Sequence, residues 1–411
     1  MKALLLPFLC FSLSLSSQAI WTIFNKSNSP LPDNAIRAVE TDKNGNLWVG
    51  TDEGLAMYDG TNWTITDTSN SNIPGNQIRS IAFDSLNHLW VGTLQYGLGI
   101  YDGTNWIKYT TANSILPDDQ VRSIAFDSSN TAWIGTVGGV IHISDEGWIL
   151  YDMFNSPLGA NNVNKIFVDK DDVKWIGTVN GGISRKQGNT WSVYKNTNSG
   201  LTDNTVFDLE SDYLGNIWFA TPAQGLGRYN GTAWYYRLTA NSNIPTNSIT
   251  CIEVVSSTDV KYMGTFDKGL VRWNNAFAFD SFTMSNSPMP DNYINCMKYA
   301  GNGKVWIGTA SEGLVLFQDT TTFNPVSGIK PVQDRSIGLF PNPATDHIIV
   351  NYSDAGNGSL RIFDLTGAVL VDVVFSNSLS SLIPIDGFAQ GMYVVQIVSR
   401  DSVQSATFVK Q

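Results

Sequence analysis

Residues suited to acid–base or nucleophilic chemistry are few and scattered in this chain. It contains three histidines, His88, His142 and His347. A catalytic nucleophile needs a histidine within hydrogen-bond reach, and these three stand at unrelated positions relative to the surrounding sequence motifs. A lone histidine of this kind is more often packed or solvated than catalytic.

Carboxylates are plentiful, and their abundance weakens any argument from a pair. Two facing acids can hydrolyse a glycosidic bond, and Asp52, Glu53, Asp267 and Glu312 are candidates. The chain has 36 acidic residues, however, so such pairs arise easily. The segment that begins at Asp42 (DKNGN) lacks the other ligands of a calcium loop. We therefore predict no catalytic residue, no metal site and no cofactor, and an enzyme is the less favoured class.

Composition excludes several classes of partner. The chain has 411 residues, with 25 Lys and Arg against 36 Asp and Glu, and a net charge of −11. This charge opposes binding to nucleic acids and to anionic membranes. Its three cysteines are too few for a disulfide scaffold.

One phrase, Trp-x-Gly-Thr with small variations, recurs through most of the chain. Its aromatic residue is found at seven positions, Trp48, Trp90, Trp133, Trp175, Trp218, Tyr262 and Trp306. The steps between these positions are 42, 43, 42, 43, 44 and 44 residues. A second phrase, Asn-Ser-x-(Leu/Ile/Met), recurs with the same period from Asn28 to Asn286. Two phrases with one period indicate a structural repeat.

Each period contains four short apolar runs separated by turn residues. The runs are rich in β-branched and aromatic residues, which is typical of strands. Four antiparallel strands in about 43 residues form one propeller blade. We therefore predict an all-β protein with a seven-bladed β-propeller at residues 20–323.

The ends of the repeat region indicate how the ring closes. Trp21 to Phe24 corresponds to the fourth strand of a blade, and Gly313 to Phe317 corresponds to the third strand of the last blade. We expect the incoming strand to complete blade seven, because this leaves no open sheet edge. The alternative is that Thr320 to Phe323 forms its own fourth strand.

Residues that recur in the blades are assigned to structure. The Trp is expected to pack between blades, and the Gly allows close backbone approach. An aspartate precedes the first hairpin in at least four blades and is interpreted as a turn residue; these aspartates are Asp42, Asp84, Asp127 and Asp169. Cys251 and Cys296 share a position that holds a small residue in other blades, namely Ala38, Ser80 and Ser123. We predict a small-residue slot with free buried thiols.

Positions that vary between blades are better candidates for ligand binding. The loops from strand four to strand one and from strand two to strand three should gather on one face, around the channel. The second set includes Gln95 and Tyr96, whose ring could stack on a sugar, and Asp267 and Lys268. These four residues are predicted to contact a ligand.

A charge asymmetry marks the first strand of each blade. One position holds Arg37, Arg79 and Arg122 in blades one to three. The other blades have uncharged residues there, namely Asn164, Phe207, Thr250 and Asn295. The planar guanidinium fork suits carboxylates and sulfates, so we predict a site for an anionic ligand such as a uronic-acid sugar. The alternative is that each arginine stacks on an aromatic ring or pairs with a nearby aspartate.

The repeat resembles the two-component regulator propeller family, through the pattern Asp-x-x-Gly-Asn-Leu-Trp-Val-Gly-Thr-x-x-Gly-Leu from Asp42 to Leu55. Members of this family often form the periplasmic sensor half of hybrid histidine kinases that respond to oligosaccharides. This chain shows no membrane helix, kinase or regulator domain, so we do not expect a sensor role to carry over. The repeat is similar, more distantly, to streptogramin lyase, but the scattered histidines weaken that analogy.

The 43-residue period stops after residues 324–338, which are rich in Pro, Gly and charges and are interpreted as a linker. Residues 339–411 contain alternating runs that predict a small C-terminal β-sandwich. These runs include 347–352, 359–363, 368–375 and 392–397.

The tail resembles the C-terminal sorting domain of type IX secretion substrates. The resemblance rests on motif residues that include Pro341, Asn342, Pro343, Gly367, Gly391, Tyr393 and Lys410. It implies recognition by the secretion machinery, export through the outer membrane, and proteolytic removal of the tail with release or surface attachment of the cargo. The alternative is an ordinary binding sandwich.

Residues 1–19 have the layout of a secretory signal peptide. Lys2 precedes an apolar stretch from Ala3 to Ser16, and small residues at Ser17 and Ala19 mark a cleavage site. The stretch is too short and too rich in serine for a good membrane span. We expect no transmembrane segment in the mature chain and an extracellular or outer cell-surface location.

These observations favour a non-enzymatic binding or adhesion module at the cell surface, with glycans as the ligand class and a protein ligand as a further option. One alternative is a lyase or glycoside hydrolase that acts on anionic polysaccharide. Another is a purely structural scaffold for protein interactions.

Overall fold

The computed structural model describes residues 19–411 except 257, 275–278, 320–337, 365–368 and 400–402. The chain divides into two compact units, Met1–Asn324 and Pro325–Gln411. All regular structure in the described residues is β, and no helix there could cross a membrane. The predicted signal peptide falls outside the described residues up to Gln18, and so do almost all of the predicted linker and the alternative strand at 320–323.

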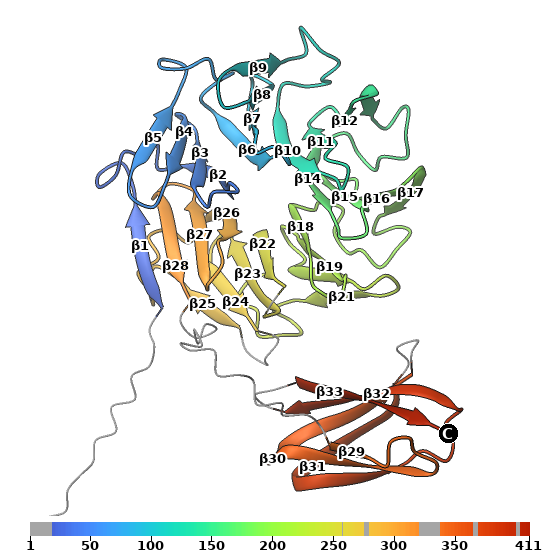
Figure 1. Ribbon diagram of the computed structural model, residues 1–411. Coiled ribbons are helices and arrows are strands. Elements are labelled where there is room, and N and C mark those ends of the chain that lie inside the picture. The colour runs from blue at the N-terminus through green and yellow to red at the C-terminus, as the bar shows by residue number, and fades with distance from the viewer. Residues whose placement is uncertain (1–18, 257, 275–278, 320–337, 365–368, 400–402) are drawn as a thin grey trace, which may run out of the picture. The chain divides into compact units, whose positions relative to one another are not determined.

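The first unit is a ring of seven four-stranded antiparallel sheets, as predicted (Figure 1). Blade one contains β2 (Ile36–Thr41), β3 (Leu47–Thr51), β4 (Leu55–Tyr58) and β5 (Trp63–Thr66). Blade two contains β6 (Ile78–Phe83), β7 (Leu89–Thr93), β8 (Leu98–Tyr101) and β9 (Trp106–Tyr109). Blade three contains β10 (Val121–Phe126), β11 (Ala132–Thr136), β12 (Val140–Ser144) and β13 (Gly147–Tyr151).

The remaining blades continue the same order around the ring. Blade four contains β14 (Val163–Val168), β15 (Lys174–Thr178), β16 (Ile183–Gln187) and β17 (Thr190–Tyr194). Blade five contains β18 (Asp208–Ser211), β19 (Ile217–Ala220), β20 (Leu226–Tyr229) and β21 (Trp234–Arg237). Blade six contains β22 (Ile249–Val255), β23 (Val260–Thr265), β24 (Leu270–Trp273) and β25 (Asp280–Phe282). Blade seven contains β26 (Ile294–Tyr299), β27 (Lys304–Thr309), β28 (Leu314–Gln318) and β1 (Ile20–Phe24).

The first strand of the chain closes the ring, which confirms the expected closure. β1 pairs antiparallel with β28, and Trp21 lies opposite Phe317. The Trp21 ring packs against Phe317 and Phe282, with centroid distances of 4.6 and 5.6 Å. The first strand in the sequence therefore completes the last blade, and β28 is paired with a strand on both sides.

The repeated tryptophans pack between neighbouring blades, as predicted. Trp90 of blade two shares a buried cluster with Val121 and Ile134 of blade three. The glycine two residues after it makes room for this contact: a Cβ on Gly92 would lie 2.6 Å from Val121 Cγ1. Large aromatic rings fill the space between the twisted sheets, and the small residue lets the backbones approach.

The repeated aspartates organise the turn between the first and second strands. In blade five, Asp212 accepts hydrogen bonds from the backbone N–H groups of Leu214 and Asn216 and from Asn216 Nδ2. It also accepts one from Trp218 Nε1, at 2.8 Å. Equivalent aspartate–tryptophan bonds occur in the first four blades. The predicted turn role is therefore confirmed, and the same carboxylate also anchors the interblade tryptophan.

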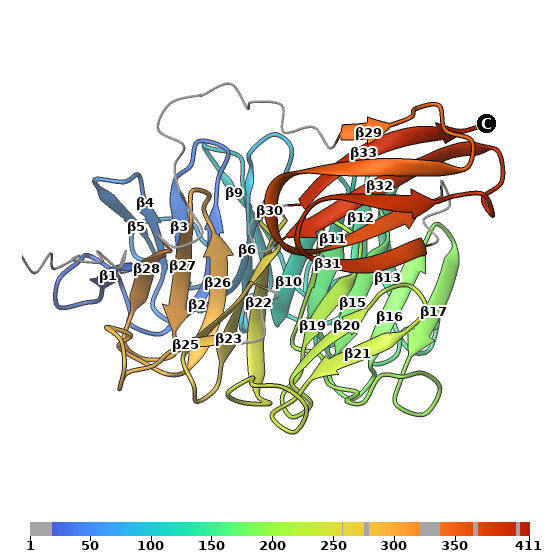
Figure 2. The ribbon, with the colours of Figure 1, turned by 90° about the horizontal axis from the view of Figure 1, so that it is seen from below.

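The loops divide between the two faces of the ring. The turns between first and second strands lie on one face, which we call the hairpin face, and the first strands run through the thickness of the ring to the other (Figure 2). We call this second face the mouth face. On it, the loop between the second and third strands of one blade forms a backbone hydrogen bond with the loop that leads into the first strand of the next blade. Gly97 N donates to Asp119 O, for example, and Gly225 N donates to Asn247 O. The two loop sets gather on one face, as expected.

The second unit is a small β-sandwich built around one long hairpin. Its strands are β29 (Gly338–Phe340), β30 (His347–Phe363), β31 (Val369–Pro384), β32 (Gly391–Ser399) and β33 (Val403–Lys410). One end of β30 pairs with β29 and the other end with β32, while β31 follows β30 along both ends. Side chains from both ends, such as Ile348 and Ile362, share one core. The separate strands predicted at 347–352 and 359–363 are wrong in detail, because β30 is continuous through both segments.

Candidate functional site

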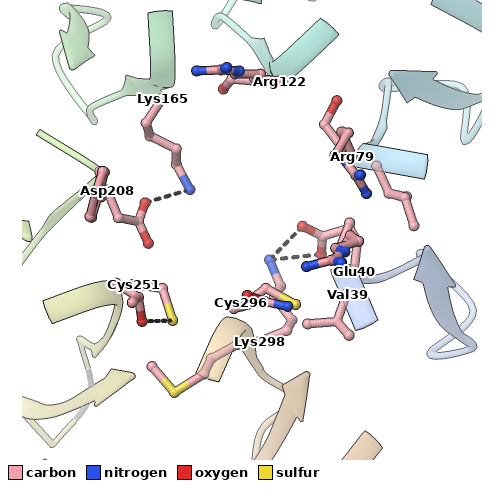
Figure 3. Close-up of a pocket in the computed structure, with 18 of the residues that line it drawn as sticks. Val39, Glu40, Arg79, Arg122, Lys165, Asp208, Cys251, Cys296 and Lys298 are labelled. Atoms are coloured by element: carbon pink, nitrogen blue, oxygen red, sulfur yellow. Dashed lines mark hydrogen bonds and ion pairs between the residues drawn. The ribbon is translucent and has the colours of Figure 1, made fainter. Parts of the chain in front are cut away.

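The first strands of all seven blades enclose a cavity of about 320 Å³ on the axis of the propeller (Figure 3). Its wall carries both positive and negative side chains from non-adjacent parts of the sequence. The charged residues that line it are Arg37, Glu40, Arg79, Arg122, Lys165, Asp208, Glu210, Glu253 and Lys298. A concave site with converging polar groups is the usual setting for ligand binding.

An irregularity in the first strand aims the arginines at this cavity. β2 pairs with β3 through Ile36 and Ala38, and its register shifts at Arg37. β6 and β10 shift in the same way at Arg79 and Arg122. A bulge re-aims the side chain at the extra residue. Each arginine and the residue after it consequently line the cavity together.

Two of the three arginines share one carboxylate. Asp52, from the loop between β3 and β4, accepts from Arg37 Nη2 and from Arg79 Nη1, each at 2.6 Å. The hydrogen bond that Arg37 donates to Asp52 is the main reason that the pKa of Arg37 is raised. For these two residues, the alternative of pairing with a nearby aspartate is present in the structure.

Arg122 has different neighbours. Its Nη1 donates to the side-chain oxygens of Asn162 and Asn164, at 2.8 and 3.0 Å, and its Nη2 donates to Gln120 Oε1. Among the described residues, no carboxylate lies within ion-pair distance of it. Burial lowers the pKa of Arg122, although nearby Asp118 opposes this, and the positive charge of Arg79 lowers it further. The guanidinium is thus held in place by neutral amides without being neutralised.

An ion pair crosses the wall next to Arg122. Lys165 Nζ lies 2.8 Å from Asp208 Oδ1, and Asp208 Oδ2 also accepts from Ile252 N. Burial opposes the charge of Lys165, but Asp208, Glu210 and Glu253 outweigh it and raise the pKa of this lysine. Lys165 therefore stays positive and is already paired (Figure 3).

The wall toward the hairpin face is acidic. Glu40 pairs with Lys298 at 2.7 Å, and Glu253 accepts from Tyr299 N. Burial, together with the charge of Glu253, raises the pKa of Glu210 to about 8. Burial also raises the pKa of Glu253. The channel thus runs from a basic sector at the mouth face to a sector with half-buried carboxyl groups.

The predicted small-residue slot is only partly correct. Five blades have a small residue after the bulge, and in the described chain Cys251 and Cys296 are both free, the first buried and the second half-buried. The other two blades hold Lys165 and Asp208 there, and these form the ion pair described above. Alignment of the seven repeats would have placed these two charges at neighbouring positions around the ring, so a sequence signal for them existed.

The predicted loop residues lie on the mouth face, outside the residues that line the cavity. Tyr96 is 48% exposed, and its ring packs on the backbone of Gly75. Gln95 precedes it in the same loop. Asp267 and Lys268 face each other at 4.0 Å, and both are about half exposed. The structure therefore separates these four residues from the cluster formed by the arginines.

The histidines stand apart from the cavity, as the sequence indicates. His88 Nδ1 lies 2.9 Å from Asp84, within a hairpin-face turn. His142 stacks on Trp133 with a centroid distance of 4.2 Å, and His347 contacts Asp346 in the sandwich. None of the three is within the set of residues that line the channel.

The sorting-motif residues of the tail hold its first segment against its last strand. Asn342 Nδ2 donates to Thr407 O, and its Oδ1 accepts from Val409 N. Tyr393 donates to Ala389 O and stacks on Phe408. Gly391 pairs with Lys410 across β32 and β33. Pro341 and Pro343 flank Asn342 and are exposed, and Gly367 lies outside the described residues.

Family models match segments of both units. The model of the secretion system C-terminal sorting domain matches residues 338–411. The model of the two component regulator propeller matches four repeats, at residues 30–53, 72–95, 115–138 and 288–311. No curated protein matches the chain.

Solved structures share the fold at low sequence identity. PorZ, a surface component of the type IX secretion system of Porphyromonas gingivalis, is 19% identical with a TM-score of 0.58, over 94% of this chain and 60% of that one. The extracellular domain of the two component system protein BT3049 from B. thetaiotaomicron is 19% identical with a TM-score of 0.64, over 95% and 57%. Virginiamycin B lyase from Staphylococcus aureus is 12% identical with a TM-score of 0.59, over 73% and 99%.

The chain spans less than two thirds of the length of PorZ and of the BT3049 domain. At these identities the likeness concerns the fold alone. The family matches and the sheet order agree, and the match to the secretion system C-terminal sorting domain points to a secreted or cell-surface location. The chain is a seven-bladed propeller in which four repeats match the two component regulator propeller model, and its residues 338–411 match the secretion system C-terminal sorting domain.

Proposed function

We propose that this protein is a non-enzymatic binding module that the type IX secretion machinery exports through recognition of the C-terminal domain. Its propeller binds acidic glycans at the mouth face of the channel. The observation that carries the proposal is Arg122, a half-buried guanidinium without a carboxylate partner in the described residues. Binding of an anion to a guanidinium in this position is favourable, because burial has removed part of the hydration of the positive charge.

Arg79 supplies a second contact for the same anion. It reaches Asp52 through Nη1, and it lines the channel together with Arg122. Arg79 and Arg122 occupy the same position in neighbouring blades, and the charge of Arg79 acts on Arg122. Two guanidinium groups in this arrangement suit a carboxylate or a sulfate. Uronic acids and sulfated sugars are the glycans that carry these groups.

The test is the affinity of the propeller for oligogalacturonate, measured by calorimetry. We expect Arg122→Gln to weaken binding roughly tenfold, which corresponds to about 1.4 kcal/mol, and the double change with Arg79→Gln to weaken it further. The dependence on salt should flatten in the same order. Lys304→Gln is the matched control, because it removes an exposed positive charge at the hairpin face.

The proposal is wrong if the wild-type protein binds neither uronate nor sulfated oligosaccharides. The site is wrong if Arg122→Gln and Lys304→Gln bind equally well. Depolymerisation of the oligosaccharide during the measurement would favour the lyase or hydrolase alternative over a binding module.

A further inference from the structure

An aromatic pair stands at the mouth face beside the basic sector. Phe266 follows β23 and Tyr293 precedes β26, and their ring centroids are 4.2 Å apart with an interplanar angle of 35°. Phe266 is 54% exposed although it is a large apolar side chain. Tyr293 is half-buried beneath it. An exposed phenylalanine held against a second ring presents a flat apolar face to solvent.

The position of Phe266 in the repeat explains why its side chain reaches the neighbouring blade. It is the residue directly after the recurring threonine of the phrase, the position that Asp52 occupies in blade one. Asp52 reaches from blade one to Arg79 of blade two. Phe266 reaches in the same manner from blade six to Tyr293 at the start of blade seven. One loop position therefore carries a carboxylate in one blade and an aromatic ring in another.

Backbone hydrogen bonds fix the loops that carry the two rings. Phe266 N donates to Ser248 O, and Ala310 N donates to Tyr293 O at 2.9 Å. Two further hydrogen bonds join these loops to the neighbouring blade: Gly269 N donates to Asn292 O, and Gly313 N donates to Asn34 O. A ring fixed by its loop loses little conformational freedom when a ligand stacks on it.

The pair is a neighbour of the basic sector, because blade seven adjoins blade one in the closed ring. The hydrogen bond to Asp52 is the main cause of the raised pKa of Arg37, and the Tyr293 side chain adds a smaller contribution. The two blades are in direct contact here, because Asn295 Nδ2, two residues after Tyr293, donates to Ile36 O, next to Arg37, at 2.8 Å. The mouth face presents aromatic rings in blades six and seven and guanidinium groups in blades one to three, in one continuous arc.

We propose that Phe266 and Tyr293 form a stacking subsite for a sugar ring of an acidic oligosaccharide whose carboxylates lie on the arginines. The inference rests on the proposed function and adds the length and shape of the ligand to it. A pyranose ring has one face of C–H groups that packs on an aromatic ring, while its carboxylate stays with a guanidinium. A ligand that spans the arc needs more than one sugar residue, so the site binds oligosaccharides more tightly than single sugars.

The experiment compares galacturonic acid with its trimer on the mature protein. We expect Phe266→Ala and Phe266→Leu each to weaken binding of the trimer roughly tenfold, and Phe266→Trp to retain it. The leucine variant keeps the apolar bulk and loses the aromatic face. Val179→Ala is the matched control, because Val179 occupies the same loop position in blade four. Binding of the monomer should change with Arg122→Gln but not with the variants of Phe266.

The outcomes separate the two proposals. If no uronate binds to the wild-type protein, the proposed function fails. If the trimer binds in a manner that depends on Arg122, and Phe266→Ala or Phe266→Leu binds it as well as the wild type does, the stacking subsite is overturned while the proposed function stands. Equal losses for Phe266→Ala and Val179→Ala would also overturn it, because the effect would then belong to the loop and not to the ring.

Discussion

The hairpin face and the mouth face of the propeller are built from the same seven repeats but use them differently. On the hairpin face, five blades repeat one network in which an aspartate closes the turn and binds the tryptophan indole. On the mouth face, the residue after the recurring threonine differs between blades, for example Asp52 in blade one and Phe266 in blade six, and the arginines occur in three blades only. Side chains that pack the fold therefore repeat from blade to blade, whereas residues that differ between blades are the ones that remain available for a ligand.

The exceptions on the packing side support this distinction. Blades six and seven have Ser256 and Ala300 in place of the aspartate. Blade six also has Tyr262 in place of the tryptophan, and its hydroxyl donates to the buried Asp319 at 2.7 Å. The aromatic side chain of blade six thus still finds a carboxylate, although from another blade. In blade six a different residue therefore meets the same structural requirement. The mouth-face arginines, by contrast, are replaced by uncharged residues in the other four blades.

The largest effect should come from breaking the seam of the ring. Deletion of residues 20–27 removes β1 and exposes the edge of β28 together with the apolar face under Trp21. We expect aggregation or loss of the folded monomer, measured by size-exclusion chromatography and thermal unfolding. Ile20→Ser is the control, because Ile20 is 59% exposed. An unchanged melting temperature after the deletion would show that the ring closes in another way.

A smaller effect is expected from breaking one hairpin network. Asp212→Ala leaves the indole N–H of Trp218 and the amide of Asn216 without their acceptor in a buried setting. The expected loss is about 2–4 kcal/mol of unfolding free energy, measured by denaturant titration. Asp59→Ala, which removes a similar but exposed turn acceptor, should cost much less. Comparable losses for the two variants would contradict a special role of the buried network.

The smallest effect concerns the carboxyl groups inside the channel. Because the pKa of Glu210 in the folded protein is about 8, above its ordinary value of 4.5, the folded state holds a proton that the unfolded state releases. Its contribution to stability is complete below pH 4.5 and is lost as the pH rises through 8. Glu210→Gln should flatten this decline and gain about 1–2 kcal/mol at pH 9.

Melting temperatures between pH 4 and 9 would measure this effect. The groups that face Glu210 are Glu253, Lys165 and Asp208, and Glu253 contributes in the same direction. Asp267→Asn on the mouth face serves as the control, since Asp267 is exposed. Parallel pH profiles for the wild type and Glu210→Gln would show that Glu210 is ionised in the folded protein at neutral pH.

The sequence was sufficient for the propeller because each blade folds from local hairpins, so that period, strand number and ring closure follow from the spacing of the motifs. It was not sufficient for the charge pairs. Asp52 forms an ion pair with Arg79 of the neighbouring blade. Whether a loop aspartate can reach this arginine depends on a bulge in β6, and no residue type in the sequence predicts that bulge. The pair Phe266 and Tyr293 depends on loop conformation in the same way. Lys165 and Asp208 were within reach of the sequence, because they occupy one repeat position in adjacent blades.

The closure of blade seven by β1 has a consequence for the order of folding. Six blades can form as soon as their own residues are available, because each is a meander of neighbouring strands. Blade seven must join partners that are about 300 residues apart in the chain, and contacts of such long range form late because loop closure costs entropy. The propeller is therefore incomplete until both of its ends have been synthesised, and a chain interrupted at any earlier point leaves β1 without its partner.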